Sequence, residues 1–373
     1  MSPASQSFDI FCRVVDNFGD IGVCWRLARQ LAASTGTQRV RLWVDDLNSF
    51  HRIAKGIDPL RSSQSLGNID IVHWNAATPS VCPHPVVIEA FACNPPAEFI
   101  QAMRQQHSIW INLEYLSAES WVESCHALPS VQGNGLKKYF FFPGFTPSTG
   151  GLLREIQLLQ KRDEWLADTE QRWQLLQGLG LDANALQALR SGARQVMLFC
   201  YPDAPVSSLL ASLANDPKPS VVLAPVGVCP DLYKHPTDHV RLCHIPFIDQ
   251  PAFDHLLWSS DLNFVRGEDS LVRALWASKP LVWQIYHQDE NTHLIKLQAW
   301  LQRSDYPDSI AQLMTHWNTG SATDFESTLT QALQPKDWHA WQACSQELST
   351  MLAAQDDLVT NLITFCTQMQ RTG

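Results

Sequence analysis

Apolar and polar positions alternate along the first half of the chain in a way that predicts strands and helices in turn. The run FDIFCRVV (8–15) is apolar and rich in strand-forming residues. Residues 21–33 then place Cys24, Leu27 and Leu31 on one helical face. Further strands are predicted at 40–46, 69–74, 85–91 and 108–115. Short apolar runs separated by helical segments favour a parallel sheet covered on both faces.

The second half repeats this alternation after a stretch with a different composition. Residues 133–155 are rich in Gly, Pro and aromatic residues, which is typical of a long irregular connection, and 156–191 have a helical pattern. Strands are then predicted at 194–201, 220–226, 239–247, 261–265 and 280–286, and helices from 291 onward. The expected class is α/β, with two Rossmann-like domains and a cleft between them. The predicted divisions are a first domain at 1–155, a helical linker at 156–190, a second domain at 191–345 and a C-terminal helix at 346–373.

Length and charge narrow the function classes. The chain has 373 residues, enough for two domains of ordinary size, and 45% of them are hydrophobic, enough to fill two cores. Only 17% are charged, so the composition does not indicate disorder. The net charge of −10 argues against a nucleic-acid partner, which would require a basic patch. It is compatible with a basic protein partner.

Other patterns indicate a cytoplasmic enzyme without a membrane segment or a metal. The N-terminal stretch MSPASQSFDIFCR has no basic segment followed by an apolar one, so no signal peptide is expected. No apolar run reaches the roughly 18 residues needed to span a membrane. The ten cysteines are scattered without a C-x-x-C pair, which favours reduced, buried thiols in a cytosolic protein. Metal-binding residue types do not cluster, so no metal site is expected.

The turn DNFGDIG (16–22) follows the first predicted strand and carries two aspartates. Asp16 is expected at the strand end and Asp20 at the helix start, where open α/β sheets bind their ligands. Gly19 and Gly22 would permit a tight turn and a close approach of ligand. Asp16 and Asp20 are either a turn former and a helix N-cap, or a carboxylate pair in which one acts as a base. The turn lacks the G-x-G-x-x-G fingerprint of dinucleotide sites.

A second candidate site follows the strand that ends at Val265. Arg266 precedes a helix whose first turn contains Glu268, Asp269 and Ser270. An arginine, a serine hydroxyl and backbone amides at a helix start suit a diphosphate. The two acidic residues either complement the helix dipole or accept hydrogen bonds from sugar hydroxyls.

Aromatic residues follow two other strands of the second half. Phe199 and Tyr201, and later Phe247 with Gln250, either clamp and read a nucleotide base or belong to the ordinary core. No Asp-x-Asp occurs in the chain. That absence weakly favours metal-free nucleotide-sugar chemistry. Glu114 ends another strand of the first half, where a contact with an acceptor and a structural role are equally open.

Three long stretches resemble one protein family. RVVDNFGDIGVCWRLARQLA, FPGFTPSTGGLLRE and FVRGEDSLVRALWASKP are similar in order and spacing to the elongation factor P arginine rhamnosyltransferases, the EarP family. The resemblance extends over nearly the whole chain. It implies a GT-B fold, in which two Rossmann-like domains face each other across a cleft. It also implies transfer of rhamnose, with inversion, from dTDP-β-L-rhamnose to an arginine of bacterial elongation factor P, without another cofactor.

The resemblance also implies roles for particular residues. Asp16 and Asp20 match essential aspartates, with Asp20 preferred as general base, in a domain that binds the acceptor. Glu268 is expected to belong to the catalytic group as well as to the donor site. The remaining donor-site residues implied are Asn17, Phe18, Gly19, Phe199, Tyr201, Phe247, Gln250, Arg266, Asp269 and Ser270. The C-terminal helix is expected to return to the N-terminal domain.

The chemistry of such a transfer agrees with the residue types. A guanidinium stays protonated in water and is a poor nucleophile, and a carboxylate binds it in bidentate geometry and can take a proton as nitrogen attacks. Arg266 would stabilise the diphosphate that leaves. Two rival enzymes, a nucleotide-sugar 2-epimerase and a lipopolysaccharide glycosyltransferase, use the same architecture. A catalytically silent binder of elongation factor P is a third alternative, from a different class.

Overall fold

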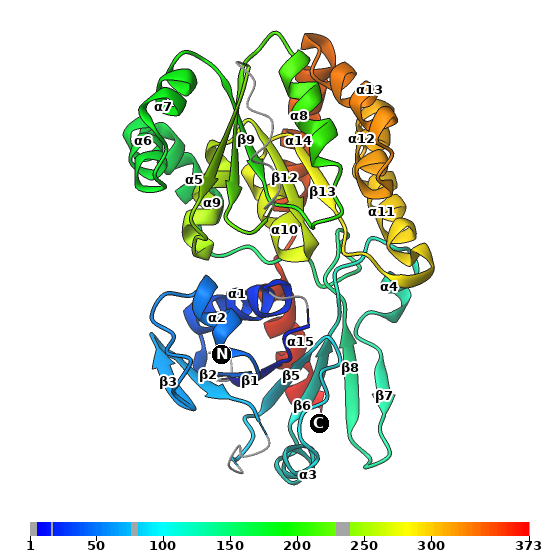
Figure 1. Ribbon diagram of the computed structural model, residues 1–373. Helices are drawn as coiled ribbons and strands as arrows, with labels where there is room; N and C mark the ends of the chain where they lie inside the picture. Colours follow the sequence, from blue (N-terminus) through cyan, green and yellow to red (C-terminus); the bar gives the residue numbers. More distant parts are fainter. Residues whose placement is uncertain (1–5, 16–17, 76–80, 229–238, 373) are drawn as a thin grey trace. The chain divides into compact units, whose positions relative to one another are not determined.

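A computed structural model describes residues 6–15, 18–75, 81–228 and 239–372 (Figure 1). Asp16 and Asn17 therefore lie outside the described residues. The chain forms two compact units: unit 1 is Met1–Ile156 with Ala353–Gly373, and unit 2 is Gln157–Leu352. Within the described ranges, no helix is both long and apolar enough to cross a membrane.

Unit 1 is built on one largely parallel sheet with strand order β3-β4-β2-β1-β5-β6-β8-β7. Its strands are β1 (Gln6–Cys12), β2 (Thr37–Val44), β3 (Ser63–Leu66), β4 (Ile69–His73), β5 (Val86–Ala90), β6 (Ile109–Leu113), β7 (Pro129–Val131) and β8 (Lys137–Phe141). Its helices are α1 (Gly19–Ala33), α2 (Leu47–Ile53), α3 (Ala97–Gln106), α4 (Trp121–Cys125) and α15 (Leu358–Thr372). The inner pairings are parallel, whereas β3 and β7 are antiparallel to their neighbours at the two edges.

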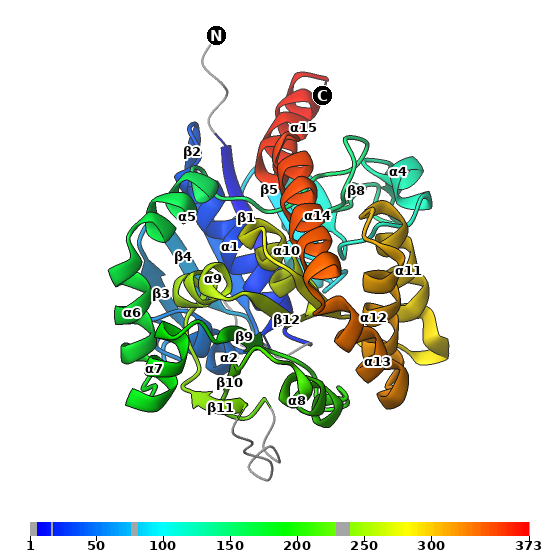
Figure 2. The ribbon, with the colours of Figure 1, turned by 90° about the horizontal axis from the view of Figure 1, so that it is seen from above.

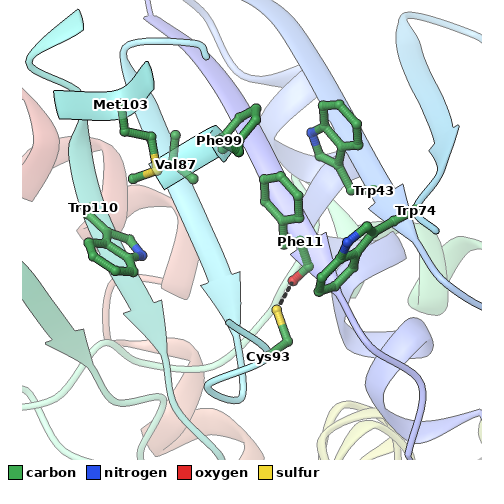
Figure 3. Packing of buried hydrophobic residues seen from close by; sticks show 8 residues of the cluster. All are labelled: Phe11, Trp43, Trp74, Val87, Cys93, Phe99, Met103 and Trp110. Carbon is green, nitrogen blue, oxygen red and sulfur yellow. Dashed lines mark hydrogen bonds between the residues drawn. The ribbon is translucent and has the colours of Figure 1, made fainter. Parts of the chain in front are cut away.

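The core on one face of this sheet is aromatic (Figure 3). Phe11 of β1 stacks on Trp43 of β2, with ring centroids 5.0 Å apart, and Phe99 of α3 meets Phe11 edge-on at 4.8 Å. Cys93 donates a hydrogen bond to the carbonyl of Phe11 at 3.4 Å. Burial of these large rings is the main force holding β1 between β2 and β5.

The C-terminal helix α15 belongs to unit 1 although it is the last element of the chain. The amide of Gln6 in β1 donates to the hydroxyl of Thr367 at 3.1 Å. Gln30 of α1 donates to Asp357, just before α15, at 2.6 Å, and Phe365 meets Tyr139 of β8. These contacts tie the helix to both ends of the β1–α1 segment.

Unit 2 is built on a second sheet, in which all described pairings are parallel, with order β11-β10-β9-β12-β13. Its strands are β9 (Arg194–Leu198), β10 (Ser220–Pro225), β11 (Val240–Ile245), β12 (Leu262–Arg266) and β13 (Leu281–Gln284). Its helices are α5 (Leu158–Ala167), α6 (Thr169–Gly178), α7 (Ala183–Arg190), α8 (Val206–Asn215), α9 (Gln250–Ser259), α10 (Gly267–Ala277), η2 (Asp289–Asn291), α11 (Thr292–Arg303), α12 (Asp308–Thr319), α13 (Ala322–Ala332) and α14 (Pro335–Ala353). Within this unit, α5–α7 and α11–α13 lie on opposite sides (Figures 1 and 2).

Three predicted boundaries differ from the structure. The stretch 133–155 is not wholly irregular, because β8 (Lys137–Phe141) pairs with β6 and with β7. Its Tyr and Phe residues favour a strand, although Gly and Pro on both sides suggested a connection. The expected linker 156–190 contains α5–α7, and α5 and α6 pack on α9 within unit 2. Unit 2 extends to Leu352 rather than 345.

Candidate functional site

Asp20 lies at the start of α1, the helix that follows β1. It is in the first turn of α1 and only 3% exposed. Its Oδ2 accepts a hydrogen bond from the backbone amide of Val15 at 2.8 Å, and its Oδ1 accepts one from the hydroxyl of Tyr115 at 3.5 Å. The residue at the N-cap position is Phe18, without a side-chain cap. The N-cap interpretation of Asp20 is therefore wrong, and its carboxylate closes the turn instead.

Three other residues of the predicted turn have different surroundings. Gly19 and Gly22 both lie inside α1. Phe18 packs under the guanidinium of Arg52 from α2, with 5.3 Å to the ring centroid. Phe18 thus helps to fix the start of α1 against α2.

Buried thiols lie near the end of β1, and Asp20 acts electrostatically on one of them, Cys12. Cys12, Cys24 and Cys93 are all buried. Burial raises the pKa of the Cys12 thiol well above its usual value, and the hydrogen bond with Cys24 and the negative charge of Asp20 raise it further. A thiol that stays protonated is neither a nucleophile nor a metal ligand. These cysteines are core residues, as expected.

The strands beside β1 bring a second carboxylate to the same edge of the sheet. β5 lies between β1 and β6, and the carboxyl ends of parallel strands meet at one edge. Glu114, directly after β6, accepts a hydrogen bond from the amide of Asn112. Asn112 in turn accepts one from the backbone of Ala92, after β5, at 2.9 Å. The amide of Asn112 therefore links the ends of two strands and orients Glu114.

An aromatic pair completes this edge. The ring of Tyr115 stacks on that of Phe91, with centroids 4.3 Å apart and 15° between the planes. Sequence reasoning did not single out either residue. The one available signal was that Tyr115 follows Glu114 at the end of a predicted strand, and stacking across strands is not visible in such a pattern.

Arg266 is the centre of the candidate site in unit 2. It is the last residue of β12, and its guanidinium donates to the carbonyl of Cys200 at 2.8 Å. The same group lies over the rings of Phe199 and Tyr201, at 4.5 and 4.7 Å from their centroids. One face of each ring expected to clamp a base is thus covered by the arginine expected to bind phosphate. The stack holds the guanidinium at the carboxyl ends of β9 and β12.

Gln284 joins this cluster, although sequence reasoning missed it. It ends β13, the neighbour of β12, and is nearly fully buried. Its Oε1 accepts from the backbone amide of Tyr201 at 2.7 Å, and its amide donates to Asp203 at 3.0 Å. A glutamine at the end of the apolar strand PLVWQ was the available signal. Gln284 fixes the loop that carries both aromatic rings.

The helix after Arg266 begins with the expected acidic turn. Gly267 has a φ of +65°, and its carbonyl accepts from the indole of Trp283 at 2.8 Å. Glu268 and Asp269 are half-buried in the first turn of α10, and Ser270 is buried. The acidic pair complements the positive end of the helix dipole from a position beside Arg266.

Phe247 and Gln250 follow β11, at the far edge of the sheet. Gln250 is buried at the start of α9, and Phe253, three residues on, meets Phe199 edge-on at 5.5 Å. Arg273 of α10 makes a buried bidentate pair with Asp254 of α9, at 2.9 and 2.7 Å. Phe253 and this ion pair hold the start of α9 in a fixed relation to α10 and Arg266.

The two edges offer different chemistry. In unit 1, a buried aspartate, a glutamate and a tyrosine suit a cationic ligand. In unit 2, an arginine beside a helix start and aromatic rings suits a nucleoside diphosphate. Among the residues that the structure describes, no group of three or more His, Cys, Asp and Glu side chains is placed to hold a metal ion.

Comparison with known proteins identifies the chain's family. Residues 8–367 match the family described as Elongation-Factor P (EF-P) rhamnosyltransferase EarP. The protein-arginine rhamnosyltransferase of Pseudomonas putida is 46% identical over 380 residues, covering 96% of this chain and 98% of its own. The protein of the same name from a strain of Neisseria meningitidis is 36% identical, covering 97% of both chains.

Solved structures agree on the fold. One described as the structural basis for EarP-mediated arginine glycosylation of translation elongation factor EF-P is 32% identical, with a TM-score of 0.65, and covers 96% of this chain and 98% of its own. A UDP-glucosyltransferase from Polygonum tinctorium is 10% identical, with a TM-score of 0.53 over 99% of both chains, and shares the fold alone. The fold is GT-B, as predicted, and the chain belongs to the EarP family of elongation factor P rhamnosyltransferases.

Proposed function

We propose that this protein transfers L-rhamnose from dTDP-β-L-rhamnose to one arginine side chain of elongation factor P, with inversion at the sugar carbon. Membership of the EarP family supports the reaction class and the acceptor. The observation that carries the mechanism is Asp20, a buried carboxylate whose direction is set by the amide of Val15. Because elongation factor P serves translation, the reaction takes place in the cytoplasm.

The acceptor binds in unit 1. Asp20, in the first turn of α1, and Glu114, directly after β6, are both carboxylates held by hydrogen bonds to neighbouring groups. A guanidinium has five N–H donors in one plane, so carboxylates on two sides of it bind it and align one nitrogen. Asp16, four residues before Asp20 in the chain, is proposed as a further acceptor ligand on the family resemblance alone.

The donor binds in unit 2. Arg266 and the first backbone amides of α10 would receive the diphosphate, because both offer positive charge at the end of β12. Gln250, Phe199 and Tyr201 would hold the base, with Phe247 beside them. Glu268, Asp269 and Ser270 would bind the sugar. We assign Asn17, Phe18 and Gly19 to donor binding on the family resemblance. No metal ion and no other cofactor is proposed.

The reaction is a single displacement. A guanidinium nitrogen attacks the anomeric carbon as the bond from that carbon to the phosphate oxygen breaks. The electron pair of that bond leaves with dTDP, and Asp20 takes the proton from the attacking nitrogen. Arg266 stabilises the growing negative charge on the diphosphate. The sugar carbon passes through an oxocarbenium-like state, by analogy with glycoside hydrolysis, and no covalent enzyme intermediate forms.

Intact-protein mass spectrometry tests this proposal. Elongation factor P is incubated with this protein and dTDP-β-L-rhamnose, beside an acceptor in which the target arginine is replaced by lysine. One added deoxyhexose on the arginine form alone is expected. No mass change on the acceptor, with the donor nonetheless bound, would contradict the proposal and favour a silent binder. Conversion of the donor without the acceptor would favour an epimerase.

A further inference from the structure

The segment after β5 has an unusual backbone. Phe91, Ala92 and Asn94 all have positive φ, at +57°, +52° and +54°, although none of them is glycine. Such conformations cost free energy and persist only where surrounding contacts impose them. The amide of Phe91 donates to the carbonyl of Leu113 at 2.8 Å. Because strained backbone clusters at functional sites, the side chains that this segment presents are candidates for a role in binding.

The strained segment presents the ring of Phe91 to that of Tyr115. The two rings are nearly parallel, and the neighbouring Ala92 is tied to Asn112 of β6. Tyr115 is 38% exposed, so part of its ring is accessible to a ligand. The tyrosine is therefore a rigid aromatic surface, supported from behind by Phe91 and held at the end of β6.

Tyr115 also contacts one carboxylate of this edge and follows the residue that carries the other. Its hydroxyl donates to Oδ1 of Asp20, and Glu114 precedes it in the chain. The result is one aromatic ring with a buried carboxylate at its hydroxyl end, on strands that are held in register by the sheet. A guanidinium fits such a site, because it stacks flat on an aromatic face while its edge donates to carboxylates.

We infer that Tyr115, backed by Phe91, forms the aromatic wall of the acceptor pocket and selects an arginine side chain over a lysine. This inference rests on the proposed function, which supplies an arginine acceptor. The selection has a physical basis: a planar guanidinium is weakly hydrated and stacks over its whole surface. An ammonium is a compact, strongly hydrated charge that gains less from the same ring. Tyr115 is thus a specificity-determining residue, with Asp20 remaining the base.

Two substitutions separate the ring from the hydroxyl. Tyr115→Phe removes the hydrogen bond to Asp20 and keeps the aromatic surface, whereas Tyr115→Leu removes both. Tyr139→Leu is the matched control, because Tyr139 is a tyrosine of β8 in unit 1 that also contacts a phenylalanine, Phe365 of α15, in an edge-on arrangement. Circular dichroism and the unfolding midpoint establish that each variant is folded.

Two readouts are measured for each protein. The first is kcat and KM for elongation factor P at saturating donor. The second is the Kd of elongation factor P, without donor, for forms with arginine or lysine at the acceptor position. We expect Tyr115→Leu to raise the KM at least roughly 10-fold and to lose most of the preference for arginine in binding, as expected when a cation–π contact is removed. Tyr139→Leu is expected to keep the KM and the arginine preference within about twofold of the unaltered protein. Tyr115→Phe is expected to keep the arginine preference, because the aromatic ring remains.

The outcomes distinguish this inference from the proposed function. If the Tyr115→Leu variant is folded and keeps the KM and the arginine preference of the unaltered protein, the inference that Tyr115 selects arginine is wrong. This holds even if the protein transfers rhamnose as proposed. If the unaltered protein transfers no sugar, the proposed function fails, and the binding preference alone then decides whether the ring recognises a guanidinium. Equal loss in Tyr115→Leu and Tyr115→Phe would assign the effect to the hydroxyl and overturn the inference.

Discussion

The backbone amide of Val15 donates a hydrogen bond to Oδ2 of Asp20, with 2.8 Å between nitrogen and oxygen. This contact joins the chain leaving β1 to the first turn of α1, so the turn between them is closed by the carboxylate itself. The direction of the carboxylate is set before any acceptor binds. Such preorganisation is what a positioned base requires, since its geometry matters before its proton affinity.

Asp20→Asn tests the role of this carboxylate. The amide oxygen of asparagine can still accept from Val15, so the turn is expected to persist while the proton acceptor is lost. We expect kcat to fall by about 10²- to 10⁴-fold with unchanged donor affinity, the range typical of removing a general base. Turnover by mass spectrometry and donor binding by calorimetry measure the two quantities. Asp70→Asn, at an exposed ion pair with Arg39, is the control, and near-normal turnover in Asp20→Asn would exclude Asp20 as base.

Arg266→Lys tests the stacked arginine. Lysine keeps the charge but loses the planar contact with Phe199 and Tyr201. Without this stack the cation is no longer held at the strand ends, and lysine cannot bind a diphosphate in bidentate geometry, so dTDP should bind about 10-fold more weakly. Isothermal titration with dTDP measures the change. Arg241→Lys, at an exposed position of β11, should bind dTDP normally, and equal affinity in Arg266→Lys would show that charge alone suffices at this position.

Gln284→Leu tests the loop that holds the two aromatic rings. The substitution removes the side-chain oxygen that accepts from the Tyr201 amide and the side-chain amide that donates to Asp203. A typical intramolecular hydrogen bond contributes about 0.5–1.5 kcal/mol, so the free energy of unfolding in urea should fall by about 1–3 kcal/mol for the two. Binding of dTDP should weaken in the same variant. Gln331→Leu, at an exposed position, should change neither the stability nor the affinity for dTDP. An unaltered urea midpoint in Gln284→Leu would show that the loop at Tyr201 does not depend on Gln284.

His126 makes stability depend on pH. Burial lowers the pKa of this histidine to about 4 in the folded chain, from an ordinary value of 6.5, and its Nδ1 accepts from the amide of Phe142 at 3.1 Å. Between pH 6.5 and about 4 the unfolded chain therefore binds more protons, so stability falls as pH falls through this window. Urea unfolding from pH 7 to pH 4.5 should show a shallower loss of stability for His126→Gln. His339→Gln, at an exposed position, should show the same dependence of stability on pH as the unaltered protein. If His126→Gln also shows that same dependence, His126 is not the origin of the acid sensitivity.

The local pattern of apolar and polar residues predicted the order of strands and helices well. It predicted strands near the edge of a sheet and side-chain contacts less well. The apolar runs in 8–15 and 194–201 predicted β1 and β9, because the interior of a parallel sheet needs short, continuous apolar strands. β8 was missed because its neighbours Gly135 and Pro143 dominated the local composition, whereas pairing with β6 decides its conformation. Pairing between strands far apart in the chain leaves no periodic signal.

Sequence patterns alone predicted the α/β class, the two units of alternating strands and helices, the start of a helix at Asp20, and the strand ends at Glu114 and Arg266. Periodicity and composition carry this information, since burial on one face of a helix or within a sheet is a local requirement. Only the tertiary structure decided what these side chains contact. Tyr115 reaches Asp20 across 95 positions of the chain, because β5 separates β1 from β6 by a single strand width. Arg266 covers Phe199 and Tyr201 because β12 pairs with β9. Strand order is set by packing of the whole sheet, so the chemistry at its edge exists only once the fold is complete.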